Sequence, residues 1–361
     1  PRRAMAPRLP ALAALPPFAR LRGLAPAVEA EGRCKRLVRP DWKLARWHRD
    51  DLRSRPWPAP APAALASGRG CQRLSARAAE LLDPSCPAIL EGMLDLWPDR
   101  GHWELESLLR EYGDADLVVG AAAAEAEGED GGGEAPVPVT MTLQGYCDYA
   151  SRQHDDCPLY IFDEAFLDGD VPLAASYSRP PCFPEDFMDS LGEQRPPHRW
   201  LLIGAERAGT ALHVDPLETA AWNTLVSGRK RWVLFPPGAE EDGLRAAPRA
   251  GGSEEEEEEE EDTSDSAGHW LHFCYPSASA SASGCMDFVQ EPGETVYVPN
   301  GWWHNVVNLE FSVAVTENFV GRHNLAASHR AMQTNCPELA ERWTNVMEED
   351  PSMRPHAASL R

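Results

Sequence analysis

The chain has 361 residues, which is enough for one large domain or two modest ones. Hydrophobic residues make up 43% of the chain, so a sizeable core can form, and no apolar run approaches the roughly 20 residues that a membrane-spanning helix needs. The formal net charge is −23, but much of it lies in one Glu-rich tract. These features predict a soluble globular protein and exclude one that crosses a membrane.

The 9 cysteines are scattered, odd in number and contain no Cys-x-x-Cys pair. Neither a disulfide framework nor a zinc module is therefore predicted. A reducing compartment is the expected setting.

Residues 1–38 are rich in Arg, Ala and Pro, and we predict a basic, disordered segment. Three interpretations stay open: a transit peptide, a nucleic-acid or nuclear-import patch, and a compositional bias of the coding sequence. The absence of Ser before Ser54 disfavours a transit peptide. Because the chain begins at Pro1 rather than Met, it can be a fragment, and no targeting peptide is assigned.

Residues 39–170 are predicted to support a catalytic domain with helices and strands. Within 77–113 we expect a helix, a buried strand at PAIL and a second helix from His102. Residues 121–136 are small and acidic and predict an inserted loop. The following VPVTMTLQGYCDYA looks like a strand, as does PLYIFDEAFL, which places Tyr160 and Phe162 on one face.

Residues 171–320 are predicted to form the core of the domain. Its first part, 173–200, is a proline-studded connector with one short helix near Phe187. The next stretch reads TALHVDPLETAAWNTLVSGRKRWVLF and contains a His-x-Asp pair. Alternate side chains of a strand share a face, so His213 and Asp215 can hold one ion between them. They supply two of the three ligands of a 2-His-1-carboxylate iron site, although His213 alone is equally compatible with a core histidine.

A second hairpin supplies the missing histidine. PGETVYVP predicts a strand, and Asn300-Gly301 is a strong turn signal because both residue types accept positive φ. His304 then stands at the start of the return strand and is the candidate third ligand. Ser312, Ala314 and Thr316 share one face of the strand that follows.

Three polar residues lie in strand-like sequence at offsets that suit a bidentate keto-acid co-substrate: Asn223, Lys230 and Thr316. Lys230 shares a strand face with Trp232 and Leu234, which favours an interior lysine over a solvated one.

Between the two hairpins lies an acidic tract, 251–267, which is predicted to be a disordered loop at a barrel edge. His269 and His272 follow it. The flanking Trp270 and Phe273 favour a strand or a loop over a helix there, and we expect neither histidine to bind metal.

Residues 321–350 predict two helices broken near Pro337. They can pack on the barrel or form a homodimer interface, and the sequence does not choose between these. The last ten residues are expected to be frayed.

Four runs of sequence carry a resemblance to a known family. They are PLYIFDEAF (158–166), RWLLIGAERAGTALHVDPLETAAWNTLVSGRKRWVLFPP (199–237), EPGETVYVPNGWWHNVVNLEFSVAVTENF (291–319) and, more weakly, RPDWKLARW (39–47). Together they resemble the JmjC (jumonji) family of Fe(II)- and 2-oxoglutarate-dependent oxygenases. The most similar branch is that of the bifunctional arginine demethylase and lysyl-hydroxylase, also described as phosphatidylserine-receptor-like. The sequence departs from this branch at Glu218, where a small residue is usual, and in the acidic tract.

The resemblance implies a mostly β fold with flanking helices, a double-stranded β-helix (jelly-roll or cupin-like barrel) of about eight antiparallel strands in two facing sheets. It implies Fe(II) as cofactor, with 2-oxoglutarate and O2 as co-substrates. The implied roles are metal binding by His213, Asp215 and His304, and 2-oxoglutarate binding by Lys230, Thr316, Asn223, Thr210 and Tyr160.

The implied function is protein oxidation, either hydroxylation of lysine side chains or demethylation of methylarginine, in histones or RNA-processing proteins. An acidic surface suits substrates rich in Lys and Arg. A nuclear location is expected, with a cytoplasmic one as the alternative, and nothing decides for or against direct nucleic-acid binding. Two other functions stay open: a non-catalytic cupin-like scaffold and a small-molecule oxygenase.

Overall fold

The computed structural model describes residues 55–60, 71–120, 140–164, 166–168, 172–245 and 266–360. The predictions for residues 1–38, for the insert at 121–136 and for the acidic tract up to residue 265 lie outside these residues. No helix in the described part of the chain is both long enough and apolar enough to cross a membrane.

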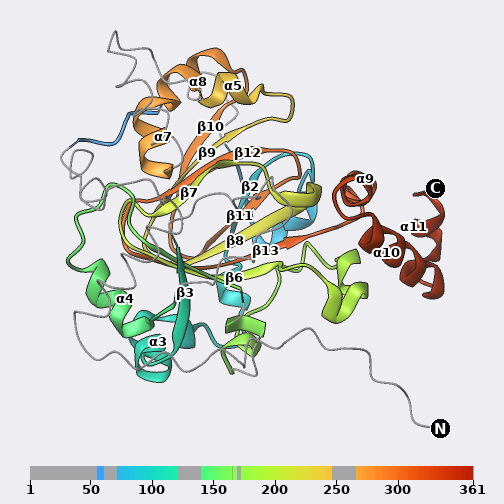
Figure 1. Ribbon diagram of the computed structural model, residues 1–361, viewed down its shortest axis with the longest axis horizontal. Coiled ribbons are helices and arrows are strands. Elements are labelled where there is room, and N and C mark those ends of the chain that lie inside the picture. The colour runs from blue at the N-terminus through green and yellow to red at the C-terminus, as the bar shows by residue number, and fades with distance from the viewer. Residues whose placement is uncertain are drawn as a thin grey trace, which may run out of the picture.

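Two facing β-sheets form the core of the molecule (Figure 1). The larger sheet has nine strands in the order β1-β2-β11-β8-β13-β6-β5-β3-β4, and the smaller has four in the order β10-β9-β12-β7. Eight strands, four from each sheet, form the predicted antiparallel barrel. They are β6 (Arg199–Gly204), β7 (Gly209–His213), β8 (Ala220–Ser227), β9 (Lys230–Phe235), β10 (Met286–Gln290), β11 (Glu294–Val298), β12 (Trp303–Asn308) and β13 (Ser312–Phe319).

Five further strands extend the larger sheet at both edges. They are β1 (Gln72–Ser75), β2 (Ala88–Glu91), β3 (Asp116–Gly120), β4 (Thr140–Thr142) and β5 (Tyr160–Asp163). β2 pairs with β11, and β5 pairs with β6. The pairing of β5 matters for function because it brings Tyr160 next to the barrel.

β9 is covered on both of its faces. All six of its residues are buried, including Lys230 and Arg231, which is the burial pattern of a strand that packs on both sides. The turn from β8 to β9 passes through Gly228, which has φ +80, and a Cβ atom at this residue would lie 2.2 Å from the carbonyl oxygen of Phe311. Only glycine fits this turn.

Alternation along β12 separates the inside of the barrel from its outer face. His304, Val306 and Asn308 point inward, where Val306 packs with Trp232. Val307 points outward and packs against three helices that cover the smaller sheet in Figure 1. These helices are α5 (Glu241–Arg245), α7 (Ala267–Phe273) and α8 (Tyr275–Ser281).

The outer face of the larger sheet packs against short helical segments that precede the barrel. They are η3 (Ala76–Leu81), η4 (Leu94–Leu96), η5 (Arg100–Trp103), α3 (Leu105–Tyr112), α4 (Leu143–Ala150), η6 (Phe166–Asp168) and η7 (Pro172–Ala175). A last segment before the barrel, η8 (Phe187–Gln194), packs instead in the apolar cluster of the C-terminal helices. The predicted short helix near Phe187 is thus confirmed as a 3-10 helix.

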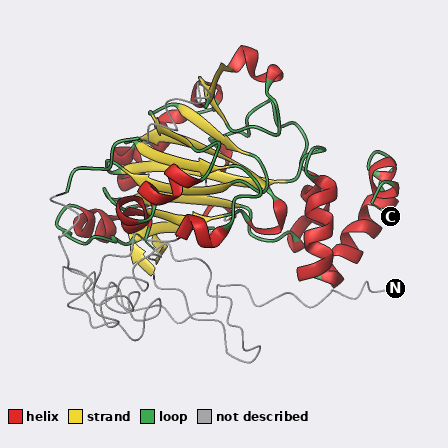
Figure 2. Ribbon diagram, turned by 90° about the horizontal axis from the view of Figure 1, so that it is seen from above, coloured by secondary structure: helices red, strands yellow, loops and turns green. Residues whose placement is uncertain are grey.

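Three C-terminal helices stand beside the barrel, as the view from above shows (Figure 2). They are α9 (Leu325–Asn335), α10 (Pro337–Glu349) and α11 (Arg354–Ala358). The predicted break near Pro337 is confirmed. The expectation that the last ten residues fray is wrong, because α11 packs Ala357 into the C-terminal apolar cluster.

Two other predictions of secondary structure are corrected. The segment around His269 and His272 is helix α7, whose first turn is capped by the Ser266 hydroxyl, which accepts a hydrogen bond from the His269 amide. The strand predicted over 137–150 is a strand only at β4. From Leu143 it is helix α4, because Thr142 caps it in the same way and residues three apart, Tyr146 and Tyr149, are buried on one side.

Candidate metal centre

Three side chains converge at one end of the barrel: His213, Asp215 and His304. One potential ligand atom from each lies within 4.8 Å of the other two, and among the described residues no other group of His, Cys, Asp and Glu does this. The Nε2 atom of His213 is 3.8 Å from Oδ1 of Asp215, and that of His304 is 4.0 Å from the same oxygen. The three predicted ligands are therefore brought together.

The two histidines are oriented by the backbone. Nδ1 of His213 hydrogen-bonds the carbonyl oxygen of Ala211 at 2.8 Å, and Nδ1 of His304 bonds that of Trp302 at 3.1 Å. Each ring therefore carries its proton on Nδ1 and turns Nε2 toward the centre. The two residues are direct neighbours across the β7–β12 pair.

Asp215 reaches the centre in a different way from the one that the sequence suggested. β7 ends at His213, so Asp215 lies in the loop that follows and not on the same strand. Its Oδ2 atom is buried and has no hydrogen-bond partner among the described residues. A carboxylate oxygen in this state is available to a cation.

The donor set fits a divalent transition metal. Burial, reinforced by the proximity of His304, lowers the pKa of His213 to about 4, although Asp215 opposes this effect. The imidazole is therefore neutral at physiological pH, which is the form that binds metal. Two imidazoles and one carboxylate on one side of a centre match the facial triad of non-haem iron.

Deeper in the barrel lies Lys230, whose predicted interior position is confirmed. Its side chain is 1% exposed and its Nζ donates a hydrogen bond to the Tyr160 hydroxyl at 2.9 Å. Burial lowers the pKa of Lys230 to about 7 and raises that of Tyr160. No carboxylate among the described residues lies within ion-pair distance of this lysine, so the pocket has a buried cation site ready for an anion.

Thr210 also faces the barrel interior, and a β-bulge is the reason. His304 and Val306 lie on the same face of β12, and their partners on β7 are His213 and Thr210. In a regular strand, residues three apart lie on opposite faces, so the extra residue in β7 places Thr210 on the same face as His213.

Asn223 and Thr316 are direct partners across the β8–β13 pair. Their strand faces continue to Leu225 and Ala314, which pack with Tyr160 inside the barrel. Oδ1 of Asn223 is buried without a partner, whereas the Thr316 hydroxyl donates to the carbonyl oxygen of Trp222 at 2.9 Å. The predicted site residues of the strands therefore come from both facing sheets and lie on their inner faces, and Asp215 joins them from the loop after β7.

One residue of these inner faces is absent from the sequence-based set. Asn308 is fully buried, lies directly across from Lys230 in the β12–β9 pair, and has an unpartnered Oδ1. Asn308 comes two residues after Val306 and four residues after His304, so all three share one face of the strand. This spacing could have identified Asn308 from the sequence. Gly204 makes room for it: a Cβ atom there would lie 2.1 Å from Nδ2 of Asn308 and 2.6 Å from the Tyr160 ring.

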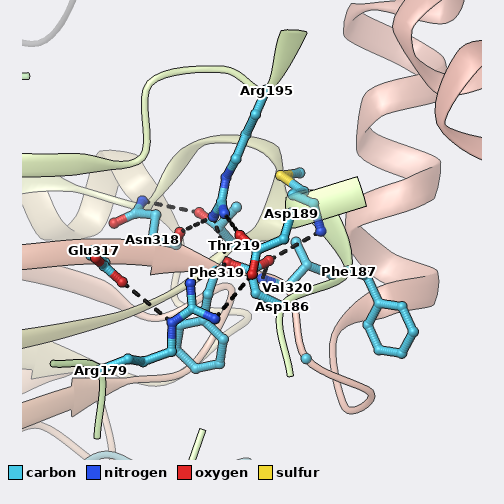
Figure 3. A network of polar contacts seen from close by, with 12 residues as sticks. Arg179, Asp186, Phe187, Asp189, Arg195, Thr219, Glu317, Asn318, Phe319 and Val320 are labelled. Carbon is cyan, nitrogen blue, oxygen red and sulfur yellow. Dashed lines mark hydrogen bonds and ion pairs between the residues drawn. The ribbon is translucent and has the colours of Figure 1, made fainter. Parts of the chain in front are cut away.

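A polar network ties the connector to the end of β13 just beyond Thr316 (Figure 3). The buried Asp186 accepts hydrogen bonds from Arg195 and from the amide of Val320. Arg179 lies 3.5 Å from Asp186 and 3.4 Å from Glu317. The network fixes the strand that carries Thr316.

The network continues to the metal-binding loop through Asn318. Its Nδ2 donates a hydrogen bond of 3.0 Å to the Thr219 hydroxyl, and its carbonyl oxygen accepts one of 3.0 Å from Arg195 (Figure 3). Arg195 of the connector is therefore linked to Thr219 of the loop through Asn318.

His269 and His272 take no part in the centre. They lie on α7, and His272 stacks on Trp57 with ring centroids 5.1 Å apart. The group of described residues that could hold a metal ion consists of His213, Asp215 and His304 and does not include them.

Comparisons with known proteins agree with this geometry. A profile of the cupin-like domain family matches residues 75–323. The chain is 38% identical over 243 residues to the lysine-specific demethylase JMJ21 of Arabidopsis thaliana, covering 67% of this chain and 24% of that protein. It is 34% identical over 273 residues to the bifunctional arginine demethylase and lysyl-hydroxylase psr-1 of Caenorhabditis elegans, covering 74% and 63%.

A more distant relative is the human 2-oxoglutarate and iron-dependent oxygenase JMJD4. It is 26% identical over 314 residues, which cover 82% of this chain and 71% of that protein. The chain thus spans less than two thirds of the length of the first two relatives.

Proposed function

Because this chain belongs to the cupin-like family, in its JmjC branch, we propose that it is an Fe(II)- and 2-oxoglutarate-dependent oxygenase that acts on proteins. The observation that carries the proposal is the presence, in one barrel, of the His213, Asp215 and His304 triad together with a buried, uncompensated Lys230. A metal-binding triad alone fits many proteins. An unpaired cation beside it calls for an anionic co-substrate.

Each residue has a distinct proposed role. His213, Asp215 and His304 hold Fe(II) through two Nε2 atoms and a carboxylate oxygen. Lys230 binds the distal carboxylate of 2-oxoglutarate, and the neighbouring Tyr160 hydroxyl orients the ammonium group through their hydrogen bond. This pairing gives the buried ammonium group of Lys230 an anionic partner.

The remaining polar residues orient the co-substrate. The Oδ1 atoms of Asn223 and Asn308 have no hydrogen-bond partner among the described residues, so both amides can accept a further hydrogen bond. Thr210 and Thr316 supply hydroxyl groups on the inner faces of the two sheets. Bound iron, with 2-oxoglutarate and O2, supplies the oxidising power for attack on a substrate C–H bond.

The substrate class follows the relatives' names, which mention lysine demethylation, arginine demethylation and lysine hydroxylation. We propose a lysine or methylarginine side chain of a protein rich in these residues. The acidic balance of the chain, with 57 Asp and Glu against 34 Lys and Arg, favours such a cationic partner. A nuclear location and a homodimer through α9–α11 stay predictions.

The test is succinate formation by the purified protein with Fe(II), ascorbate and 2-oxoglutarate, over a panel of lysine-rich and methylarginine peptides. A product 16 mass units heavier identifies a hydroxylase, and one 14 units lighter identifies a demethylase. Both must vanish in His304→Ala. If neither product appears and 2-oxoglutarate is consumed neither with nor without peptide, the oxygenase proposal fails and a scaffold role replaces it.

A further inference from the structure

The three triad residues are not held in the same way. The rings of His213 and His304 are anchored by their own hydrogen bonds to the backbone. The Asp215 carboxylate has no hydrogen bond among the described residues, and its nearest polar neighbours are the two imidazoles at 3.8 and 4.0 Å. The direction of this carboxylate is therefore set by the backbone of the loop that carries it.

That loop is strained. Leu217 and Glu218, the second and third residues after Asp215, have φ values of 53° and 52°. Arg207 is the one other non-glycine residue with positive φ in the described part of the chain. Two consecutive side-chain-bearing residues in the left-handed region persist only where surrounding contacts enforce them. The local sequence would otherwise relax, and Asp215 would move with it.

Contacts from other elements hold the loop in this shape. Asn300, in the turn before His304, donates a hydrogen bond of 2.8 Å to the Glu218 carboxylate. Asn318, at the end of β13, donates to Thr219 at 3.0 Å. Leu217 packs against the apolar cluster of the C-terminal helices.

Asn324 provides the contact closest to the strained backbone. Its Nδ2 donates to the carbonyl oxygen of Glu218 at 3.0 Å and to that of Phe319 at 3.3 Å, and its Oδ1 accepts from the amide of Gly321 at 2.9 Å. Asn324 stands at the N-cap position of α9, where an asparagine side chain normally caps its own helix. Here it makes no such bond and is fully buried.

We propose that Asn324 is a positioning residue for the metal site: it fastens the strained loop so that Asp215 faces His213 and His304. The inference rests on the proposed metal-binding function. It makes the start of the C-terminal helices part of the metal centre, although these helices contribute no ligand to it. Loss of the Asn324 bond frees the loop to relax and turns the unanchored carboxylate away.

Two isosteric variants test this proposal. Asn324→Asp keeps the acceptor for Gly321 but, as a carboxylate, cannot donate to Glu218, so binding is measured at pH 8 to favour the ionised form. Thr344→Val is the matched control, because it removes the hydrogen bonds that Thr344 makes with His329 and Ala340 in the same helix pair, and neither bond involves the loop of Asp215. The readout is the affinity for Mn(II), measured by electron paramagnetic resonance without 2-oxoglutarate or substrate, beside the melting temperature of each variant.

Asn324→Asp is expected to weaken Mn(II) binding by roughly 10- to 100-fold, the range observed when a residue that orients a metal ligand is lost. Thr344→Val should match the parent in Mn(II) affinity even if its melting temperature falls. Equal Mn(II) affinity in Asn324→Asp and the parent would overturn the proposal. If Asn324→Asp does not fold, Asn324→Ser offers a milder loss of the same donor and is judged by the same criterion.

A second measurement separates positioning from general stability. Glycine adopts φ near 52° without strain, so the loop of Glu218→Gly depends less on Asn324. Because Glu218→Gly also removes the hydrogen bond from Asn300, its reference is Asn300→Ala, which loses that bond and keeps the strain. The loss of Mn(II) affinity caused by Asn324→Asp should be smaller in the Glu218→Gly background than in the Asn300→Ala background. An undiminished loss in the Glu218→Gly background would contradict the strain argument.

His304→Ala separates this inference from the proposed function. If His304→Ala also leaves Mn(II) affinity unchanged, the metal site itself is wrong. If His304→Ala loses the metal while Asn324→Asp keeps it, the site stands and only the role of Asn324 is refuted.

Discussion

Burial of the Lys230 ammonium group lowers the free energy of unfolding of the protein without ligand, but it favours the binding of a carboxylate. Its folded pKa of about 7 lies below its ordinary value of 10.5 because burial disfavours the ammonium form. Between these two pH values the unfolded chain binds more protons than the folded one, so the contribution of this lysine to the free energy of unfolding rises with pH. A bound carboxylate removes this disadvantage.

The proposed role predicts proton uptake on binding of 2-oxoglutarate. At pH 8 Lys230 is mostly neutral in the free protein, and the bound carboxylate restores its charge, so about one proton should be taken up. The dissociation constant should rise by up to about tenfold per pH unit above pH 7. Calorimetry with Mn(II) in place of iron, in buffers of different ionisation enthalpy, measures both quantities.

Lys230→Met and Lys230→Arg are the matched controls. The methionine variant should bind 2-oxoglutarate weakly at every pH and take up no proton. The arginine variant stays charged and should lose the pH dependence. Proton uptake that persists in Lys230→Met would assign the effect to another group.

At this scale the sequence was informative because the residue types were specific. His213 was identified from the His-x-Asp pair and His304 from the hairpin turn before it. Lys230 was identified from the alternation of side chains along its strand. The contribution of Asn324 could not be, because it depends on where a helix beginning more than 100 residues after Asp215 meets the loop. The bulge that turns Thr210 inward is likewise a property of the pairing of two strands, which local sequence does not specify.

The elements of the barrel bring small residues against large ones, and the β5–β6 pair is the clearest case. Gly204 lies beside Tyr160 in the pair and has no space for a Cβ atom. The strand-forming character of both segments was readable from their Leu-, Ile- and aromatic-rich sequence. Their adjacency across the sheet was not.

Gly204→Ala should therefore damage the co-substrate pocket selectively. The added methyl group displaces Tyr160 and Asn308, which flank Lys230, but it does not touch the metal ligands. We expect the Michaelis constant for 2-oxoglutarate to rise about tenfold or more while Mn(II) affinity is retained. Equal losses of both affinities would mean that the substitution perturbs the whole barrel.

The connector network predicts a large difference between two acidic residues one position apart. The Asp186 side chain is fully buried against Arg195, whereas Glu185 pairs with Arg322 at the surface. Asp186→Ala removes the buried partner of Arg195, which keeps the half-exposed Asp189 and the Asn318 carbonyl, and should cost about 3–5 kcal/mol. Glu185→Ala should cost less than about 1 kcal/mol. Urea unfolding of both variants checks this, and similar losses would contradict the burial argument.

Helix α7 shows where element-level prediction failed. Its His-, Trp- and Phe-rich sequence has the composition of a strand, but the helix buries Trp270 and Leu271 against the outer face of the smaller sheet. Packing on an existing sheet outweighed a weak intrinsic preference. The N-cap at Ser266 was a usable signal, because a serine three residues before the His269 amide can satisfy it.

Across the whole molecule the metal centre joins elements that are otherwise separate. His213 and His304 belong to the smaller sheet, and the loop of Asp215 leads into the larger one. The two-sheet barrel followed from the family resemblance, whereas the flanking strands that widen the larger sheet to nine did not. Unfolding must break this centre, so metal binding is linked to global stability.

Mn(II) should therefore stabilise the entire barrel. At a free concentration 100 times its dissociation constant, it should raise the free energy of unfolding by about 2.7 kcal/mol. Chemical denaturation with and without metal, followed by tryptophan fluorescence, gives this difference. His304→Ala should show none of it, and a full effect in that variant would place the stabilising ion elsewhere.

The late position of β13 in the chain has a consequence for how the protein folds during its synthesis. The central strand β13 is among the last parts of the barrel to be synthesised, yet it lies between β8 and β6 in the larger sheet. Such non-local pairing makes folding slow, and it forms only after most of the chain has left the ribosome. A nascent chain that ends before His304 lacks one of the three proposed ligands, so the complete triad forms only after β12 has been synthesised and has paired with β7.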